Sequence, residues 1–373
     1  MVWTPGHTGM RQHGAAQPAR RDATVHRRQG HVRLPSLVPT ADLPTGLRRA
    51  ATSPETDRRP SVRGPLLTQR RLQVALGLLW LLDAGLQLQP YMFTKAFETQ
   101  SIGTMNAMYQ PHAIGEFIIA ITRFLAPHAT AWNALFVTIQ FAIGVGLLWR
   151  RTVRLALAVS FVWVLGVWTI GEGLGRLLTG TATLAGGAPG AVLLYGLVGL
   201  LLWPRALHGQ EPTGTSVSAE GVLGERGGRA IWAVLWFGGA ILEILPGPYP
   251  PLSVLITTIN MNLPEPDLLR HLDVVTVSFV EWAGVPLVLF LVAVETLIGI
   301  HVLRGGRRVR LVLWAGIVLS AVFWVVGQNF GGILAGNATD PNAGPLYVLL
   351  ALTLYPRKPR IAADDQQMME AHT

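Results

Sequence analysis

Long apolar stretches alternate with short polar connections from Leu72 to the end of the chain. Such stretches approach the roughly 20 residues that a helix needs to cross the hydrocarbon core of a bilayer. Eight of them predict membrane-spanning helices, at residues 72–88, 131–149, 155–170, 188–203, 230–245, 285–303, 311–326 and 345–354. The pattern therefore predicts an all-α, polytopic transmembrane protein of about eight spans, whose first partner is the lipid bilayer.

The composition agrees with this class and excludes several others. Half of the residues are hydrophobic and 14% are charged, whereas soluble domains carry about 25% charged residues. The chain has no cysteine, which excludes disulfides, dithiol relays and thiolate-bound metals. Lysine occurs only at Lys95 and Lys358, while Arg, Ala, Gly and Pro are abundant. This bias is typical of a GC-rich bacterial genome and favours a bacterial plasma membrane.

The net charge of +9 indicates topology rather than a nucleic-acid partner. Residues 1–66 hold 11 Arg and 4 acidic residues and have no apolar period, which predicts a disordered tail. The other basic residues cluster at alternate span ends: Arg70, Arg71, Arg150, Arg151, Arg154, Arg205, Arg226, Arg229, Arg304, Arg307, Arg308, Arg310, Arg357, Lys358 and Arg360. Because positive charge resists translocation, this side is predicted to be cytoplasmic, together with both termini.

The two halves of the chain repeat each other at an offset of 156 residues. Residues 154–189 read RLALAVSFVWVLGVWTIGEGLGRLLTGTATLAGGAP, and residues 310–345 read RLVLWAGIVLSAVFWVVGQNFGGILAGNATDPNAGP. Trp168 pairs with Trp324 and Pro189 with Pro345. Four spans in each copy keep the same orientation, so we predict two parallel four-helix bundles. The predicted units are residues 67–204 and 229–356, joined by a cytoplasmic linker at 205–228 and followed by a tail at 357–373.

The longest predicted outer loop of each half contains an amphipathic helix. The apolar residues that recur at helical spacing are Ile114, Phe117, Ile118, Ile121, Phe124 and Leu125, and later Leu268, Leu272, Val275 and Phe279. Such a helix either lies on the membrane interface or covers the end of the bundle.

Polar residues within spans are costly, so they indicate where a site would lie. Three pairs occupy matched positions of the two halves, with a carboxylate in one half and an amide in the other. They are Gln87 and Glu243, Gln140 and Glu295, and Glu172 and Gln328. Asp83 stands apart because its counterpart is Gly239, and it lies one helical turn before Gln87. These residues are the candidate intramembrane site, although interhelical hydrogen bonding alone would also explain them.

Glycines concentrate in the predicted outer loop that follows the third span of each half. They are Gly171, Gly175, Gly180, Gly327, Gly331 and Gly336. Glycine allows backbone conformations and close approaches that other residues resist, so these segments are either structural turns or a cradle for a ligand. Asp340 in the second loop is placed to cap a turn. No metal site is predicted. A metal site on the outer face, formed by His112 and His128, is the alternative interpretation of these two histidines.

Two stretches carry a family resemblance. They are residues 139–154, IQFAIGVGLLWRRTVR, and residues 294–310, VETLIGIHVLRGGRRVR. Each resembles the DoxX-like family of four-helix membrane proteins, in which a polar residue, usually Glu, precedes a Gly-containing apolar helix and a basic turn. Glu295 matches the family's Glu, and Gln140 replaces it. Because relatives include a quinone-linked, thiosulfate-oxidising subunit, the resemblance implies quinone contact and an oxidoreductase partner subunit.

Three functions follow from these observations. The first is a redox-associated membrane subunit that binds a quinone between the two units, with Glu243, Glu295, Gln140 and Glu172 as hydrogen-bonding groups. The second is a small-solute or proton-coupled transporter in which Asp83 and Glu295 bind a cation or proton. The third is a non-catalytic scaffold for another membrane protein. The sequence does not identify a substrate.

Overall fold

The structure, a computed structural model, describes residues 67–205, 217–219, 221–260 and 266–357. Helices dominate this part of the chain, and its one β pairing is an isolated bridge between Val217 and Pro356. The prediction of an all-α protein is confirmed for these residues. The predicted disordered tail at 1–66, half of the linker and nearly all of the C-terminal tail lie outside the described residues.

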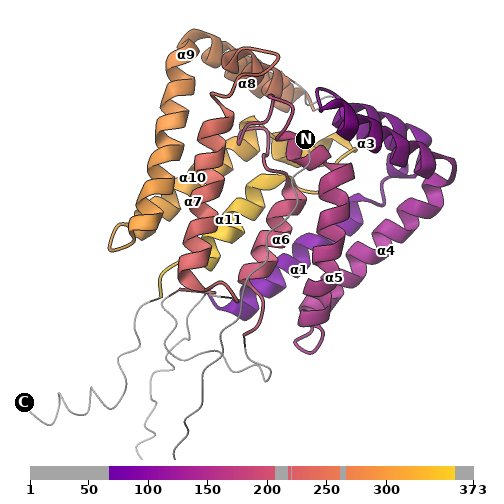
Figure 1. Cartoon of the computed structure of the whole chain (residues 1–373), viewed down its shortest axis with the longest axis horizontal. Helices are drawn as coiled ribbons and strands as arrows, with labels where there is room; N and C mark the ends of the chain where they lie inside the picture. The colour runs from indigo at the N-terminus through magenta and orange to yellow at the C-terminus, as the bar shows by residue number, and fades with distance from the viewer. Residues whose placement is uncertain (1–66, 206–216, 220, 261–265, 358–373) are drawn as a thin grey trace, which may run out of the picture. The chain divides into compact units, whose positions relative to one another are not determined.

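The helices of the first half precede those of the second half along the chain (Figure 1). The first half contains α1 (Gln69–Leu86), η1 (Pro90–Phe93), η2 (Phe97–Thr104), α2 (Met105–Ala107), α3 (His112–Leu125), η3 (Ala126–His128), α4 (Ala129–Leu148), α5 (Val153–Gly166), η4 (Val167–Gly171), η5 (Gly173–Arg176) and α6 (Ala191–Leu201). The second half contains α7 (Gly224–Leu242), α8 (Pro251–Asn260), α9 (Asp267–Arg304), α10 (Val309–Val326), η6 (Asn329–Ala335) and α11 (Ala343–Thr353). The sequence pattern did not predict α8, and α7 begins inside the predicted linker.

Each predicted span falls on a helix, but the helices differ in length. Four segments are long and apolar enough to cross a membrane: His112–Leu148, Val153–Gly171, Asp267–Arg304 and Val309–Ala335. Helices α6 and α11 have 11 residues each and reach about 16 Å, roughly half of a bilayer core. The structure is therefore compatible with a membrane protein, while the predicted spans 188–203 and 345–354 are not full-length helices.

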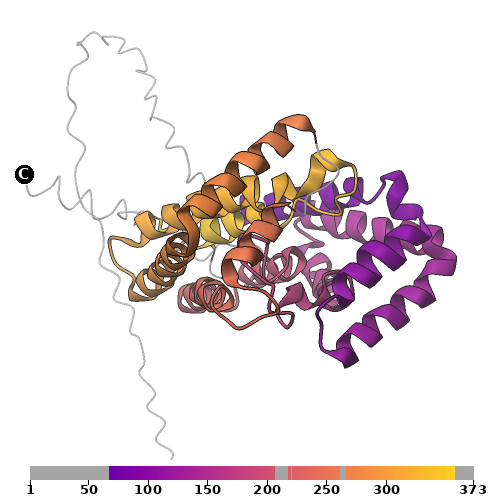
Figure 2. The same ribbon diagram turned by 90° about the horizontal axis from the view of Figure 1, so that it is seen from above.

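Helices α6 and α11 pack against each other, with α5 and α1 on one side and α10 and α7 on the other (Figure 1). Both are apolar around their whole circumference, which is typical of a helix buried on all sides. Leu194 of α6 and Leu346 of α11 are fully buried. From above, the helices of the first half (indigo to magenta) and those of the second half (orange to yellow) form two neighbouring groups (Figure 2).

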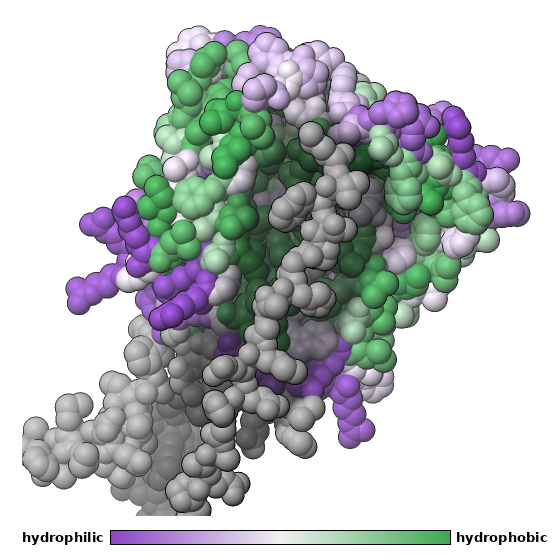
Figure 3. Space-filling model, viewed as in Figure 1, coloured by the Kyte–Doolittle hydropathy of each residue, from purple (hydrophilic) through white to green (hydrophobic). Residues whose placement is uncertain are grey.

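Arginines bind the ends of helices at one end of the bundle, here called the arginine-rich end. The Arg70 guanidinium donates to the carbonyl oxygens of Leu147 (2.8 Å) and Leu148 at the end of α4. Arg154 donates to the carbonyl oxygen of Pro204 at 3.1 Å. Hydrophilic residues gather where α4 meets α5 and where α9 meets α10, and a hydrophobic belt separates them from the opposite end (Figure 3). This pattern matches a helix bundle that spans a bilayer.

The two predicted amphipathic helices form, and each continues into a longer helix. The first is α3, which leads through η3 into α4, and the second is the start of α9. Helix α9 bends at Gly284, whose φ of +60° interrupts the regular helix two residues before Pro286. Ile118 is fully buried, but Phe124 is 67% exposed and Leu268 is 78% exposed. The described residues therefore cover only part of both apolar faces.

Candidate functional site

A cavity of about 720 Å³ lies within the first half of the chain. We call it the aromatic cavity. Helices α1, α3, α4, α5 and α6, the segments η2 and η4, and the loop after η6 supply its wall, which consists of Trp80, Asp83, Gln87, Phe97, Ser101, Ile102, Ile121, Leu125, Trp132, Phe136, Ile139, Gln140, Val159, Val162, Trp163, Gly166, Val167, Ile170, Gly171, Glu172, Val192, Tyr195, Asn337, Thr339 and Asp340. Its size lies within the range of small-molecule sites.

Four of the seven predicted polar site residues line this one cavity. They are Asp83, Gln87, Gln140 and Glu172. The side chain of Gln87 makes a structural hydrogen bond, in which its Nε2 donates to Asn133 Oδ1 at 2.6 Å. Asn133 Nδ2 in turn donates to the backbone oxygen of Gln87 at 3.0 Å. This pair joins α4 to the end of α1 and positions the polar side of the cavity.

Asp83 accepts a hydrogen bond from Tyr195, a residue that the sequence pattern did not identify. The Tyr195 hydroxyl donates to Asp83 Oδ1 at 2.8 Å, and both side chains are almost fully buried. A tyrosine within an apolar helix requires a hydrogen-bond partner for its hydroxyl, so its presence there could have identified Tyr195 as a site residue from the sequence. The contact connects α6 with α1 and holds the carboxyl group of Asp83 at the cavity wall.

Four polar atoms of the cavity residues are buried without a protein partner. They are Gln140 Oε1, Glu172 Oε2 and the indole nitrogens of Trp80 and Trp163. A buried polar group without a hydrogen bond is costly, so these atoms favour a ligand or water that satisfies them. Together they place two unpartnered acceptors and two unpartnered donors on residues of the cavity wall.

Aromatic rings form much of the remaining wall. Trp80 packs against Tyr195 with ring centroids 4.5 Å apart, and Phe136 meets the edge of Trp163 at 5.4 Å. Trp132 lies 6.3 Å from Phe136 by the same measure. Such surfaces bind flat or apolar groups well, and their faces also attract cations.

Asp340 reaches the aromatic cavity from the second half of the chain. Its Oδ1 accepts from the backbone nitrogen of Asn342 at 2.7 Å, and its Oδ2 accepts from Thr339 Oγ1 at 2.8 Å. The predicted turn cap is thus confirmed. Its position on the cavity wall was not predicted, because sequence spacing does not show which half a loop will approach. Burial raises the pKa of Asp340 above the usual value for aspartate.

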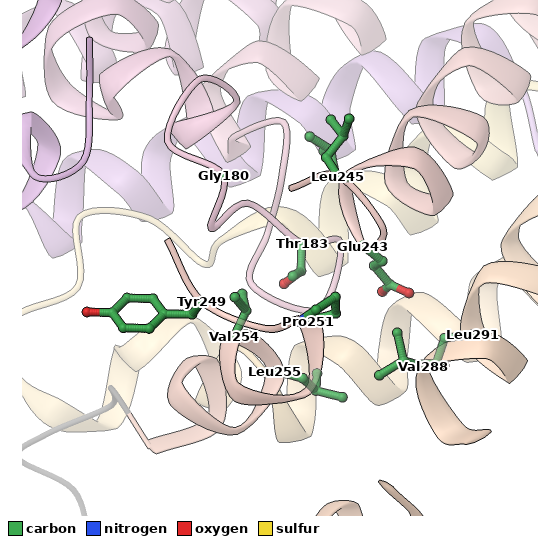
Figure 4. A pocket seen from close by; sticks show the side chains of 11 residues that line it. Gly180, Thr183, Glu243, Leu245, Tyr249, Pro251, Val254, Leu255, Val288 and Leu291 are labelled. Carbon is green, nitrogen blue, oxygen red and sulfur yellow. The ribbon is translucent and has the colours of Figure 1, made fainter. Parts of the chain in front are cut away.

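Glu243 and Glu295, also predicted as site residues, lie together elsewhere. Their carboxyl groups lie within interaction distance of each other between α7 and α9, and no other group of the described residues donates a hydrogen bond to their four oxygens. Two carboxyl groups can share a hydrogen bond only if one carries a proton. Glu243 borders a pocket of only about 10 Å³, with Thr183, Val288 and Leu291 nearby (Figure 4). The predicted set is therefore divided between two places.

The carboxylates of the two halves occupy different helices. The first half has Asp83 on α1 and Gln140 on α4, whereas the second half has Gly239 on α7 and Glu295 on α9. A Cβ atom at position 239 would lie only 2.9 Å from Glu295 Oε2 and closer still to Leu184. The second half therefore has no room for a side chain where Asp83 stands.

Glu172 and Gln328 have the same structural role in the two halves. Glu172 Oε1 accepts from the backbone nitrogen of Val192 at 2.9 Å, near the start of α6. Gln328 Oε1 accepts from the backbone nitrogen of Gly344 at 3.1 Å, near the start of α11. Each satisfies a free N–H group at a helix N-terminus. Only Glu172 also lines the aromatic cavity.

The glycine segments form the same left-handed turn in each half. Four consecutive residues have positive φ at positions 173–176 and again at 329–332. A Cβ at Gly175 would lie 1.7 Å from the backbone oxygen of Pro189, and one at Gly331 would lie 2.5 Å from that of Pro341. These contacts support the structural-turn interpretation, and of the six predicted glycines only Gly171 lines the cavity.

Each of the two turns is followed by a proline that a tryptophan contacts, at a different spacing in the two halves. Trp168 Nε1 donates to the backbone oxygen of Pro189 at 2.8 Å, and Trp324 Nε1 donates to that of Pro341 at 2.7 Å. The structural equivalent of Pro189 is therefore Pro341 rather than the predicted Pro345. The second connection is shorter by four residues, and the same shift aligns Tyr195 with Tyr347.

Glu98, beside the cavity residues Phe97 and Ser101, is fully buried, and neither carboxyl oxygen has a hydrogen-bond partner among the described residues. Burial raises the pKa of Glu98 to about 7. Between pH 4.5 and 7 the folded chain keeps a proton that the unfolded chain releases, so stability falls as the pH rises. We expect wild-type unfolding free energy to drop by up to about 3 kcal/mol between pH 4.5 and 8.

Glu98→Gln should remove the part of this pH dependence that Glu98 contributes, and melting temperatures of variant and wild type in one detergent at pH 5 and pH 8 would measure the difference. Glu116→Gln, at an exposed carboxylate, is the control and should keep the wild-type profile. An unchanged pH profile in Glu98→Gln would show that the Glu98 carboxyl is not the titrating group.

Comparisons of the chain with protein-family models, with curated proteins and with solved structures find no match.

Proposed function

We propose that this chain is an integral membrane protein that binds a small amphipathic molecule in the aromatic cavity. The observation that carries this proposal is the combination of a 720 Å³ enclosure, aromatic walls and four buried polar atoms without protein partners. An apolar site with a few convergent polar groups is the usual form of a small-molecule site. A scaffold without a ligand would gain nothing from leaving these groups unsatisfied.

The ligand would reach the cavity from the hydrophobic surroundings of the bundle. Val159 and Val162 on α5 line the cavity and are 42% and 74% exposed, so side chains do not seal it there. The residues around this opening belong to one of the segments long and apolar enough to cross a membrane. A lipid-soluble molecule could therefore enter sideways without crossing a polar surface.

The full arrangement proposed for the membrane is a tandem pair of parallel four-helix units. The matching left-handed turns and the matching tryptophan contacts to Pro189 and Pro341 support an internal repeat. In this arrangement the arginine-rich end is cytoplasmic, because positive charge resists translocation. The short helices α6 and α11 would then be enclosed by the longer ones rather than exposed to lipid.

A quinone is the second candidate ligand. The resemblance to DoxX-like proteins suggests it, and the free indole N–H groups of Trp80 and Trp163 could donate to quinone carbonyls. An oxidoreductase subunit would then be the partner that supplies or removes electrons. In this proposal Gln140 and Glu172 would contact the ring, whereas Glu243 and Glu295 would not, because they do not line the cavity.

The proposal is tested on the full chain, purified from its native membrane in mild detergent. Native mass spectrometry and solvent extraction should find a small organic molecule retained in a stoichiometric amount. A chain whose cavity is filled by the Gly166→Trp substitution should lose that molecule, while Gly238→Trp should retain it. Equal retention by both variants would place the molecule outside the cavity and refute the proposal.

A further inference from the structure

The charged groups of the aromatic cavity all have the same sign. Its ionisable wall residues are Asp83, Glu172, Asp340 and the phenol of Tyr195, and its wall contains no Lys, Arg or His. None of the three carboxyl groups takes part in an ion pair recorded for the described residues. Asp340 is also close enough to interact electrostatically with both Asp83 and Glu172. The cavity therefore concentrates acidic groups for which its wall supplies no basic partner among the described residues.

Clustered carboxylates in an apolar enclosure are unfavourable unless protons or a bound cation neutralise them. A small inorganic cation would require several converging oxygens, but most of this wall is aromatic and aliphatic. A large cation with apolar substituents would satisfy both features, because aromatic faces such as those of Trp132 and Trp163 attract positive charge. The unpartnered oxygens of Gln140 and Glu172 would accept from any N–H groups that it carries.

We propose that the ligand of the aromatic cavity is an organic cation, an ammonium or similar group that carries apolar substituents. This inference rests on the proposed function and adds the charge of the ligand to it. A quinone fits less well, since its carbonyl oxygens only accept hydrogen bonds and would face carboxylate oxygens. Protons compete with such a cation for Asp83, Glu172 and Asp340, so binding should weaken as the pH falls.

Two ions of matched size and opposite charge test the inference. Tetraphenylphosphonium should bind saturably to the purified full chain, and tetraphenylborate should not. Glu172→Gln should weaken tetraphenylphosphonium binding about tenfold, because it removes one charge-assisted contact. This variant should fold, since Gln328 makes the equivalent cap at α11. Asp340→Asn is the second neutralising variant, with the same expected loss.

Control and outcomes separate the two proposals. Glu116→Gln removes an exposed carboxylate outside the cavity and should leave tetraphenylphosphonium binding unchanged. Equal binding of tetraphenylphosphonium and tetraphenylborate would overturn the cationic ligand. So would decylubiquinone binding that Gly166→Trp removes, if tetraphenylphosphonium does not bind. Both outcomes would keep the cavity as a binding site. The proposed function is refuted as well if two results occur together. Gly166→Trp leaves the binding of tetraphenylphosphonium, tetraphenylborate and decylubiquinone unchanged or none of them binds, and the purified chain retains no native molecule.

Discussion

Replacing Gly175 with alanine is expected to abolish the stable fold. The residue has a φ of +61°, and a Cβ there would lie 1.7 Å from the backbone oxygen of Pro189. The backbone of residue 175 fixes the Cβ position and the oxygen belongs to the backbone of Pro189, so neither atom can move aside without displacing the start of α6. The combined clash and strain should cost more than about 4 kcal/mol, at the exceptional end of single substitutions. Size-exclusion profiles and melting temperatures of the detergent-extracted protein would measure it.

Gly332→Ala is the matched control for Gly175→Ala. Gly332 has a φ of +67°, but the atom nearest to its Cβ would be 3.8 Å away. The equivalent residue of the first half is Arg176, which adopts a φ of +59° with a full side chain. The control should therefore cost only about 1 kcal/mol of left-handed strain. Equal losses for the two variants would show that backbone conformation, and not the contact with Pro189, makes Gly175 necessary.

Replacing Gly166 with tryptophan is expected to raise the Kd of the ligand at least tenfold, which corresponds to a loss of about 1.4 kcal/mol of binding free energy. Gly166 lines the aromatic cavity, and a Cβ there meets no atom within 4 Å. The new indole would therefore occupy space that the ligand needs. The fold should be retained, because any residue but proline is a better helix former than glycine within α5. Equilibrium dialysis with labelled tetraphenylphosphonium would measure the affinity.

Gly238→Trp controls for the added indole. Position 238 lies within α7, away from the cavity wall, and its Cβ also meets nothing within 4 Å. Its affinity and melting temperature should match those of the wild type. If Gly166→Trp binds as tightly as this control, the ligand does not use the cavity space beside α5.

The periodicity of the sequence determined most of the secondary structure. Apolar stretches predicted the helices because a helix in an apolar environment must satisfy its own backbone hydrogen bonds and present apolar side chains. The arginines predicted which helix ends lie together, and contacts such as that of Arg70 with Leu147 join those ends. The repeat predicted matched roles for Glu172 and Gln328, which follow from local hydrogen bonds at a helix start.

Only the tertiary structure decided which polar residues share a site. Asp83, Gln140 and Glu172 meet in one cavity, whereas Glu243 and Glu295 pair with each other. Sequence spacing places a side chain on a face of its helix, but which faces meet depends on packing across the whole bundle. Asp340 shows this most clearly, because it lies more than 250 residues after Asp83 and still borders the same cavity.

The sequence by itself thus determined helices, their apolar faces and the arginine-rich end, because these depend on local hydrogen bonding and on the preference of each side chain for water or lipid. The length of the two short helices, the proline that each of Trp168 and Trp324 contacts and the aromatic cavity were decided only when distant segments packed. Packing density across the whole bundle sets those features, and no single stretch of the chain encodes it.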